Sequence, residues 1–564
     1  MSEDVEVKRP RPSALSWLRD AMPRVGQAGS RSATLHSDAE QVPRLERNYR
    51  ELNRFAAQRW LGTLGAVLIM VGGIGAGATP VIGNAFWGTW IGTVLGQMLQ
   101  ASTIVTFTGI GLLVIAWLGV GALVYSGARS KVSTVDVPLL KRTYLSWMIP
   151  LMFTAPLFTQ DIYSYLAQGA IVVRGMDPYS AGPVDLLGAA DPLARSVPLI
   201  WSHDPSPYGP VAMMVAAAIS VITSDHVLLS VFLHRLVSVA SLIVVGWALV
   251  RLAKRCGVSP QFALWLGVLN PLVLLHLVGG IHNESLLLAL LLVGFELCLL
   301  ALHGPPRPGA RDSMVEPGRP VLDRRGWALF AAGVLLISMA GLVKVTGFVA
   351  LGFVGMQLAR RFGQRFINVI TAAMITGLIM AISVTVMSLL SGLGFGWITS
   401  QGGAAAVRSW MSLPTSLGTL SGFIGRVLGI GDISESALTL TRAVGVAIAI
   451  GWLVRMLWAT FRGRVHPLGG YGLSTLVLVL LFPVVHPWYL LWALVPLAAW
   501  ANRQSFRLVT VVYSVIFSFT VLPRGMGLPP GTVLQIYLGS AAAFIIVLAL
   551  VAVLMNRKGL LRIR

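Results

Sequence analysis

One carboxylate in the sequence stands where an apolar run gives way to a polar loop. Asp161 follows closely on the apolar residues 143–158, and Tyr163 and Tyr165 come just after it. A charge placed further into the hydrocarbon would cost roughly 2.5–3.5 kcal/mol on insertion scales. At the boundary the carboxylate can stay ionised and face a cavity. Asp161 is therefore a candidate general base for removing a hydroxyl proton, a role that contributes about 10²- to 10⁴-fold in rate, and Tyr163 is a candidate for lining a sugar site.

The alternative interpretation of Asp161 is structural. Aspartate is a favoured residue at a helix N-cap, and a helix is expected to follow over residues 162–173. The two interpretations are compatible, because a helix N-terminus also favours the ionised carboxylate. The sequence leaves both open.

The loop 159–207 that begins there carries further candidates. Arg174 is predicted to hold a lipid phosphate, or else to pair with Asp177. Asp177 and Tyr179 are candidates for contact with a sugar or acceptor, although Gly-Met-Asp-Pro-Tyr at 175–179 is also typical of a turn. Trp201 and Tyr208, in a proline-rich segment, fit either sugar stacking or the aromatic belt at a membrane surface.

Polar residues also interrupt the apolar runs elsewhere. His282 and Asn283 separate two such runs, Lys344 stands alone in a third region, and His486 begins a His-Pro-Trp-Tyr segment. Ionisable residues inside a membrane are functional candidates by default. Lys344 and His486 are predicted to hold a phosphate, and His282 and Asn283 to contact a sugar or acceptor. The alternatives are snorkelling of Lys344 to the interface and hydrogen bonding of the histidines inside the bundle.

The elements that must position these side chains are membrane-spanning helices. The 564 residues are 55% hydrophobic and 12% charged, with a mean hydropathy of +0.76, whereas soluble domains carry roughly 25% charged residues. Since a spanning helix needs about 20 apolar residues, the apolar runs predict an all-α, polytopic transmembrane helical bundle of about 14 spans. Runs 209–223 and 415–430 are ambiguous between short spans and helices lying at the surface.

The net charge of +21 is spread over short basic clusters between the apolar runs. That distribution follows the positive-inside rule and indicates topology rather than nucleic-acid binding. We expect a disordered cytoplasmic tail at 1–55, a transmembrane domain at 56–555 and a basic cytoplasmic C-terminus at 556–564. The loop 159–207 and the other candidates then gather on the outer face of the plasma membrane.

The outer face limits the chemistry. Cys256 and Cys298 are too few for a disulfide framework or a metal cluster. No nucleotide sugar is available outside the membrane, so a sugar donor must arrive on a lipid. A carboxylate, phosphate-holding donors and aromatic residues on one face predict a lipid-linked sugar transferase. The alternative class is a transporter or flippase for a lipid-linked sugar, although such proteins usually show internal repeats and broken helices at mid-depth.

These residues resemble a known family. Thr-Gln-Asp-Ile-Tyr-Ser-Tyr at 159–165, Gln-Gly at 168–169 and Arg-Gly-Met-Asp-Pro-Tyr at 174–179 resemble the first outer loop of the C-type glycosyltransferases. They are more closely similar to the actinobacterial polyprenol-phosphomannose-dependent α(1→6) mannopyranosyltransferases of lipomannan synthesis. The segments 206–210, 270–284 and 486–489 resemble the same family. The likeness covers most of residues 55–555.

The resemblance implies the C-type glycosyltransferase fold, with helices in the outer loop, and an inverting enzyme. The donor would be β-linked polyprenyl-phosphate mannose, and the product an α(1→6) mannan, the lipomannan and lipoarabinomannan backbone, on a phosphatidylinositol-mannoside anchor. Asp161 matches the family's catalytic acidic residue. Many C-type enzymes carry a paired acidic motif there, but here the neighbours are Gln160 and Ile162, so we expect no metal and no cofactor. Another lipid-phosphate sugar, such as arabinofuranose or glucose, stays open, as do an initiating or elongating role and the oligomeric state.

Overall fold

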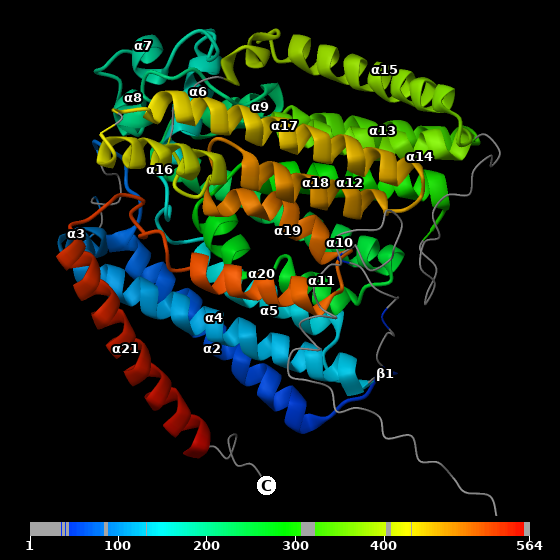
Figure 1. Ribbon diagram of the computed structural model, residues 1–564. Helices are drawn as coiled ribbons and strands as arrows, with labels where there is room; N and C mark the ends of the chain where they lie inside the picture. The colour runs from blue at the N-terminus through cyan, green and yellow to red at the C-terminus, as the bar shows by residue number, and fades with distance from the viewer. Residues whose placement is uncertain are drawn as a thin grey trace, which may run out of the picture.

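The computed structural model of the chain is a bundle of helices that lie broadly alongside one another (Figure 1). It describes residues 35, 40, 44–83, 88, 90–130, 132–305, 322–401, 408–429 and 431–557. Within these ranges the only strands are β1 (Arg44–Leu45) and β2 (Val132–Ser133), which form one short parallel pair. The expected all-α fold class is confirmed.

Seven of the described helices are long and apolar enough to cross a membrane. They are α2 (Tyr49–Ala76), α4 (Leu99–Ser130), α10 (Val227–Cys256), α12 (Glu284–His303), α15 (Phe366–Leu390), α17 (Ser434–Phe461) and α21 (Pro530–Arg557). Shorter helices pack among them: α5 (Val137–Leu151), α11 (Pro260–Leu266), α13 (Arg324–Gly341), α14 (Val349–Phe362), α18 (Pro467–Leu481), α19 (Leu491–Ala498) and α20 (Gln504–Phe517). The expected polytopic membrane protein is confirmed, while the count of about 14 spans stays a prediction.

The two ambiguous runs form short helices. The run 209–223 becomes α9 (Pro210–Thr223), which has 14 residues, and the run 415–430 becomes α16 (Leu413–Val427), which has 15. At a rise of about 1.5 Å per residue, each is about 21–23 Å long, shorter than a hydrocarbon core of about 30 Å. Neither helix is therefore long enough to cross the core by itself.

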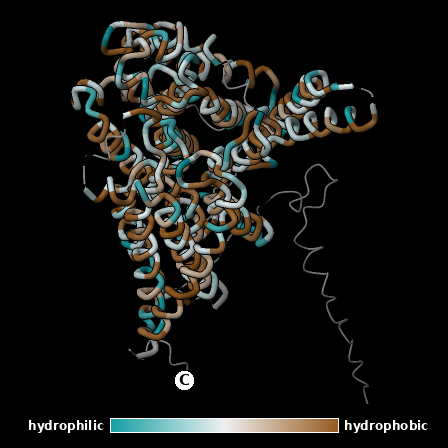
Figure 2. Tube along the Cα trace, turned by 90° about the vertical axis from the view of Figure 1, so that its left-hand side faces the viewer, coloured by the Kyte–Doolittle hydropathy of each residue, from teal (hydrophilic) through white to brown (hydrophobic). Residues whose placement is uncertain are grey.

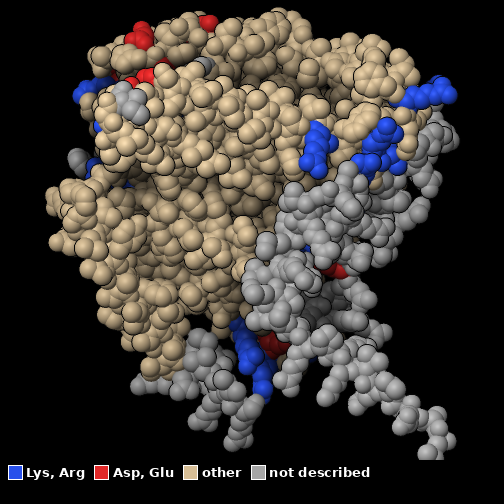
Figure 3. Space-filling model, in the orientation of Figure 1, with Lys and Arg blue, Asp and Glu red and all other residues tan. Residues whose placement is uncertain are grey.

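The outer surface of the bundle is apolar. Figure 2 shows hydrophobic residues along most of the helices, and Figure 3 shows charged side chains near the ends of the bundle with an uncharged band between them. Helices α15, α17 and α21 expose large side chains such as Leu378, Ile448 and Leu538. An apolar area of this size on a soluble protein would be an aggregation risk, whereas lipid tails are as apolar as leucine.

The loop 159–207 folds into short helices at one end of the bundle (upper left in Figure 1). They are α6 (Asp161–Val173), α7 (Pro183–Leu187), α8 (Pro192–Ser196) and the 3₁₀ helix η3 (Leu199–Trp201), and α9 follows. Helices α7, α8 and α9 each begin with a proline, a residue whose fixed φ and missing N–H suit the first helical position.

The N-terminal boundary differs from the expected one at residue 55. Helix α2 already begins at Tyr49, because the Asn48 side chain accepts a hydrogen bond from the Arg50 N–H at 3.0 Å and caps the first turn. Further upstream, Glu40 accepts hydrogen bonds from Arg507 at 2.6 Å and from the Ser259 N–H at 2.9 Å. Part of the expected tail is thus bound to the bundle. Most of the tail, and residues 558–564, lie outside the described residues.

A buried ion-pair network joins two of the long helices. Glu296 of α12 accepts from Arg255 Nε at 2.6 Å and from Arg251 Nε at 2.8 Å, both on α10. The side chains of Arg255 and Glu296 are 0% and 1% exposed. A buried charge is costly without a partner, so the carboxylate holds these guanidinium groups in the bundle.

We expect Glu296→Ala to destabilise the protein by about 3–5 kcal/mol, because it takes the carboxylate away from a buried arginine. The measurement is thermal unfolding in detergent. Glu435→Ala is the control, since it breaks an ion pair with Arg408 whose members are 80% and 53% exposed, and such pairs contribute under about 1 kcal/mol. Equal losses in the two variants would contradict the prediction.

Candidate active site

Asp161 is the first residue of α6, and its side chain does not cap the helix. Gln160 occupies the N-cap position, and the Asp161 N–H donates to the Thr159 hydroxyl at 3.2 Å. The Asp161 carboxylate instead accepts a hydrogen bond from the Trp201 indole N–H at 3.2 Å. The capping interpretation of Asp161 is therefore wrong for this structure. The Asp161 side chain is mostly buried, with 21% of it exposed.

One histidine lies beside this carboxylate, and a second shares its aromatic platform. Nδ1 of His282 is 3.9 Å from the second Asp161 oxygen, which is too long for a direct hydrogen bond. The His282 and His486 rings both stack on Trp488, with ring centroids 4.2 Å and 4.5 Å away. His282 Nε2 is buried and has no hydrogen-bond partner among the described residues. Trp488 thus brings together two imidazoles from distant parts of the chain, of which His282 faces the base candidate.

Lys344 points into the same cluster. Its ammonium donates to Glu284 at 2.9 Å and lies over the rings of Tyr489 at 4.2 Å, Trp492 at 4.7 Å and Tyr208 at 5.9 Å. Contacts of a cation with aromatic faces are favourable when the cation loses water. Lys344 and Glu284 are 17% and 1% exposed. Lys344 therefore reaches inward, and the snorkelling interpretation is wrong.

Each of these groups stands at a break between helices. Asp161 opens α6, and His282 lies between the π-helix η4 (Val273–Gly279) and α12. Lys344 precedes the 3₁₀ helix η5 (Val345–Phe348), and His486 precedes η8 (Pro487–Leu490). Helix breaks leave side chains and main-chain groups free to form a site, and inside a membrane they occur where protein surrounds them. The structure brings together six of the sequence-predicted residues, namely Asp161, Trp201, Tyr208, His282, Lys344 and His486.

Arg174 does not join them. It is the C-cap residue at the other end of α6, about 20 Å from Asp161 by helix rise. Its guanidinium pairs with Asp191 at 2.7 Å and with Asp225 at 3.4 Å, not with Asp177 as the sequence suggested. The sequence could not show this, because the two acidic partners are distant from Arg174 along the chain: Asp191 is the N-cap residue of α8, and Asp225 lies between α9 and α10. The prediction that Arg174 holds the donor phosphate is not supported by this geometry.

Four other residues that the sequence predicted for the sugar or acceptor site are buried, partly buried or hydrogen-bonded within the protein itself. Tyr163 is fully buried, and its hydroxyl donates to the Ala78 carbonyl at 2.9 Å. Asp177 accepts from the Tyr179 N–H at 2.9 Å, which confirms the turn interpretation, and Tyr179 is itself buried. Asn283 is the partly buried N-cap residue of α12. Tyr163 therefore fixes α6 to the segment after α2, Asp177 and Tyr179 belong to a turn of the loop, and Asn283 is the neighbour of His282 in the cluster.

The sequence-based selection missed several members of the cluster. Glu284 was visible as a carboxylate at the start of an apolar run, and Trp488 and Tyr489 belong to the His-Pro-Trp-Tyr segment. Trp492 stands three residues after Tyr489, which places both rings on one helical face, and they stack at 4.4 Å. The spacing of Tyr489 and Trp492 was the sequence signal that could have indicated the aromatic rings around Lys344.

The surroundings raise the pKa of Asp161. Burial is the largest cause, and the nearby charge of Glu284 acts in the same direction. Hydrogen bonds from Thr159 and Trp201 and the charge of Lys344 oppose this shift without cancelling it. A carboxylate whose pKa lies above its ordinary value is a better proton acceptor. The site thus tunes Asp161 toward the role of a base.

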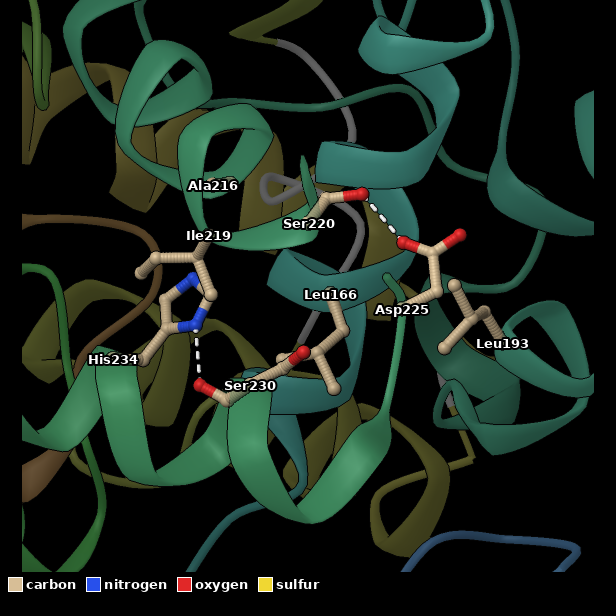
Figure 4. A pocket seen from close by; sticks show the side chains of 8 residues that line it. All are labelled: Leu166, Leu193, Ala216, Ile219, Ser220, Asp225, Ser230 and His234. Atoms are coloured by element: carbon tan, nitrogen blue, oxygen red, sulfur yellow. Dashed lines mark hydrogen bonds between the residues drawn. The ribbon is translucent and has the colours of Figure 1, made fainter. Parts of the chain in front are cut away.

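A small cavity is lined by residues of α6, α8, α9 and α10 and is not part of the cluster (Figure 4). Its wall includes His234, which hydrogen-bonds to Ser230, and Asp225, which accepts from Ser220. None of the six clustered residues lines it. Across the described ranges, no group of three His, Cys, Asp or Glu side chains is arranged to hold a metal ion. The expectation of a metal-free site stays a prediction.

The fold defines an all-α polytopic membrane protein, and comparison with known proteins places it among the glycosyltransferases. The family profile described as "Alpha-(1->6)-mannopyranosyltransferase, N-terminal domain" matches residues 59–360, and the "MptB C-terminal domain" matches residues 414–549. The chain belongs to the α-(1→6)-mannopyranosyltransferase family, as its resemblance implied. No solved structure matches it.

Individual relatives are similar over nearly the full chain. α-(1→6)-Mannopyranosyltransferase B of Corynebacterium glutamicum is 48% identical over 96% of this chain and 92% of its own length. An α-(1→6)-mannopyranosyltransferase of Mycobacterium tuberculosis is 38% identical over 93% of this chain and 92% of its own length. The α-(1→6)-mannopyranosyltransferase A of the same species is 34% identical over 79% of this chain and 80% of its own length.

We expect Asp161 to lose its proton at a higher pH than the ordinary aspartate value of 3.8. The measurement is infrared difference spectroscopy of the wild type against Asp161→Asn, following the protonated carboxyl band as pH rises. Asp432 is the control, because hydrogen bonds from Ser434 and its pair with Arg426 hold the pKa of Asp432 at about 2. An Asp161 band that disappears at or below pH 3.8 would contradict the prediction.

Proposed function

We propose that this protein transfers mannose from polyprenyl-phosphate mannose to a growing α-(1→6) mannan on the outer face of the membrane. The observation that carries the proposal is the meeting of Asp161, Lys344 and two histidines at helix breaks at one end of an apolar bundle. The names of the relatives support mannose as the sugar and α-(1→6) as the linkage. The acceptor is the mannan on a phosphatidylinositol-mannoside anchor.

The reaction needs one base and one stabilised leaving group. The 6-hydroxyl oxygen of the acceptor attacks the anomeric carbon and forms the new C–O bond. Asp161 takes the hydroxyl proton. The bond between the anomeric carbon and the phosphate oxygen breaks, and the polyprenyl phosphate leaves with the electron pair. Attack opposite to a β-linked phosphate gives the α product, so the proposed transferase inverts the configuration.

Lys344 is the proposed partner of the phosphate. Its ammonium lies on aromatic faces and already shares its charge with Glu284 at 2.9 Å. An ammonium has three N–H donors, so Lys344 can donate to a phosphodiester oxygen while it keeps its bond to Glu284, and the leaving phosphate gains charge as the bond breaks. A fixed cation stabilises developing charge more strongly in a dry site than in water. His486, stacked on Trp488, stands beside Lys344 as a second donor candidate.

Aromatic residues are proposed to hold the sugar. Trp201 binds the Asp161 carboxylate through its indole N–H at 3.2 Å, so its ring also fixes the direction of the base. Tyr208 lies between this region and Lys344, and its hydroxyl is 3.2 Å from that of Tyr165. His282 and Asn283 adjoin the base on the α12 side. Faces of this kind stack on sugars while the polar tips bind hydroxyls.

The proposed reaction uses no metal and no cofactor. A lipid monophosphate leaves without a diphosphate, so the leaving group carries less charge than a nucleotide would. Asp161 stands between Gln160 and Ile162 without a second carboxylate in the motif. In the proposed topology the polar cluster lies toward the outer face rather than at mid-depth, which favours a transferase over a transporter.

We expect Asp161→Asn to lower the transfer rate by about 10²-fold or more, because the amide cannot accept the proton. The measurement is mannosyl transfer from polyprenyl-phosphate mannose to a short α-(1→6) mannoside, in membranes with equal amounts of each protein. The wild-type rate should also fall as pH drops through the raised pKa of Asp161, since the base is then protonated. Arg174→Ala, which alters the other end of α6, is the control and should keep most of the activity.

Full activity of Asp161→Asn would exclude Asp161 as the general base. Absence of transfer by the wild type with polyprenyl-phosphate mannose, but transfer of arabinose or glucose from the matching lipid phosphate, would change the sugar. Absence of transfer with every lipid-phosphate sugar would favour the transporter.

We expect Lys344→Met to raise the KM for the donor by about tenfold or more and to lower kcat, because the phosphate loses its cation in both the bound and the leaving state. Steady-state kinetics with varied donor checks this. Lys254→Ala, an exposed lysine in the last turn of α10, should leave both constants within about twofold. Unchanged donor kinetics in Lys344→Met would exclude Lys344 from phosphate binding.

A further inference from the structure

A buried arginine lies behind the candidate site and takes no direct part in the proposed reaction. Arg235, in α10, is 2% exposed. Its guanidinium donates to four main-chain carbonyls: Met152 at 2.8 Å, Thr154 at 2.6 Å, Val278 at 3.1 Å and Gly279 at 3.5 Å. A charged residue inside a membrane helix is costly, so its presence points to a function.

The four carbonyls explain how this charge is tolerated. Met152 and Thr154 follow the end of α5, and Val278 and Gly279 form the end of η4. The last carbonyls of a helix lack partners within the helix and carry partial negative charge. The planar fork of arginine offers five N–H donors in a fixed arrangement. Arg235 therefore ties together the C-terminal ends of two helical segments.

Both segments lead directly to the site. The chain runs from Thr154 to Asp161 on one side and from Gly279 to His282 on the other. The two segments also touch directly, because the Leu157 N–H donates to the Gly279 carbonyl at 3.0 Å. The carbonyls that bind Arg235 thus stand just before the base and just before the imidazole that faces it.

The two connections contain unusual backbone conformations. Phe158 has φ +69° and Ile281 has φ +58°, and they are two of the four non-glycine residues with positive φ in the part of the chain that the structure describes. This region is unfavourable for side chains, above all for β-branched ones such as isoleucine. Such conformations persist only where the surroundings hold them in place. The hydrogen bonds of Arg235 are placed to hold the backbone in the segments that lead to both Phe158 and Ile281.

We propose that Arg235 is a positioning residue of the transferase, which clamps the ends of α5 and η4 so that Asp161 keeps its direction and its 3.9 Å separation from His282. The inference rests on the proposed function in one respect, that Asp161 is the base. Arg235 itself touches neither donor nor acceptor. Its loss should therefore act through the geometry of Asp161 and not through donor binding.

The test is a double-mutant cycle of Arg235→Lys and Asp161→Asn, read by mannosyl transfer from polyprenyl-phosphate mannose. Lysine keeps the positive charge but has three donors on one atom and cannot reach four carbonyls. We expect Arg235→Lys to lower kcat by about tenfold or more, since small misplacements of a reacting group are costly, and to leave the donor KM within about twofold. In the Asp161→Asn background the same change should alter the residual rate by less than about twofold.

Arg251→Lys is the matched control, because it makes the same substitution on the same helix in an ion pair with Glu296. It should leave kcat unchanged. A loss that is equally large with and without Asp161, or that appears mainly in the donor KM, would overturn the positioning role. If Arg235→Lys does not fold, as judged by size-exclusion chromatography, Arg235→Gln enters the same cycle. Failure of both variants to fold beside a folded Arg251→Lys would show a role in folding and also overturn the proposal.

The experiment separates this inference from the proposed function. A wild type without transfer activity refutes the proposed function itself. An active wild type with full activity in Asp161→Asn refutes the base. An active wild type, an impaired Asp161→Asn and an unaffected Arg235→Lys refute only the role of Arg235.

Discussion

The structure depends on one constraint, that main-chain polar groups surrounded by hydrocarbon must find partners within the protein. Continuous helices meet it along most of the described chain, and hydrophobic residues follow these helices (Figure 2). The constraint is hardest to meet where a helix stops, because the last carbonyls lose their partners. The candidate site is built at such helix ends, so the proposed chemistry takes place where main-chain groups need hydrogen-bond partners from outside their own helix.

Charges inside the bundle are satisfied in three different ways. Arg255 shares the carboxylate of Glu296, Lys344 combines Glu284 with aromatic faces, and Arg235 uses main-chain carbonyls alone. Asp161 differs from these, because its hydrogen bonds come from neutral donors and one side stays exposed. A carboxylate without a direct cationic contact keeps the raised pKa that a proton acceptor needs. Asp161 is thus the charge in the site that has no direct ionic partner among the described residues, which suits a group that takes up a proton during the proposed reaction.

The two family profiles that match the chain share the candidate site between them. The N-terminal family profile ends at residue 360 and includes Asp161, His282 and Lys344, whereas His486 and Trp488 lie in the region of the C-terminal profile. The stacking of His282 on Trp488 therefore joins the two matched regions at the site. Neither region contains the whole cluster, so the proposed chemistry requires the packing of both.

The sequence alone determined the membrane class, the helical fold and the position of Asp161, because apolar length, charge placement and residue type are local properties. It also indicated Lys344, His282 and His486, since an isolated polar residue stands out in an apolar run. Tertiary structure decided the rest. Arg174 pairs with Asp191 and Asp225 from the segments beside α8 and α9, and the clamp by Arg235 depends on where two helical segments end. These outcomes depend on distances between segments far apart in the chain, which residue patterns do not specify.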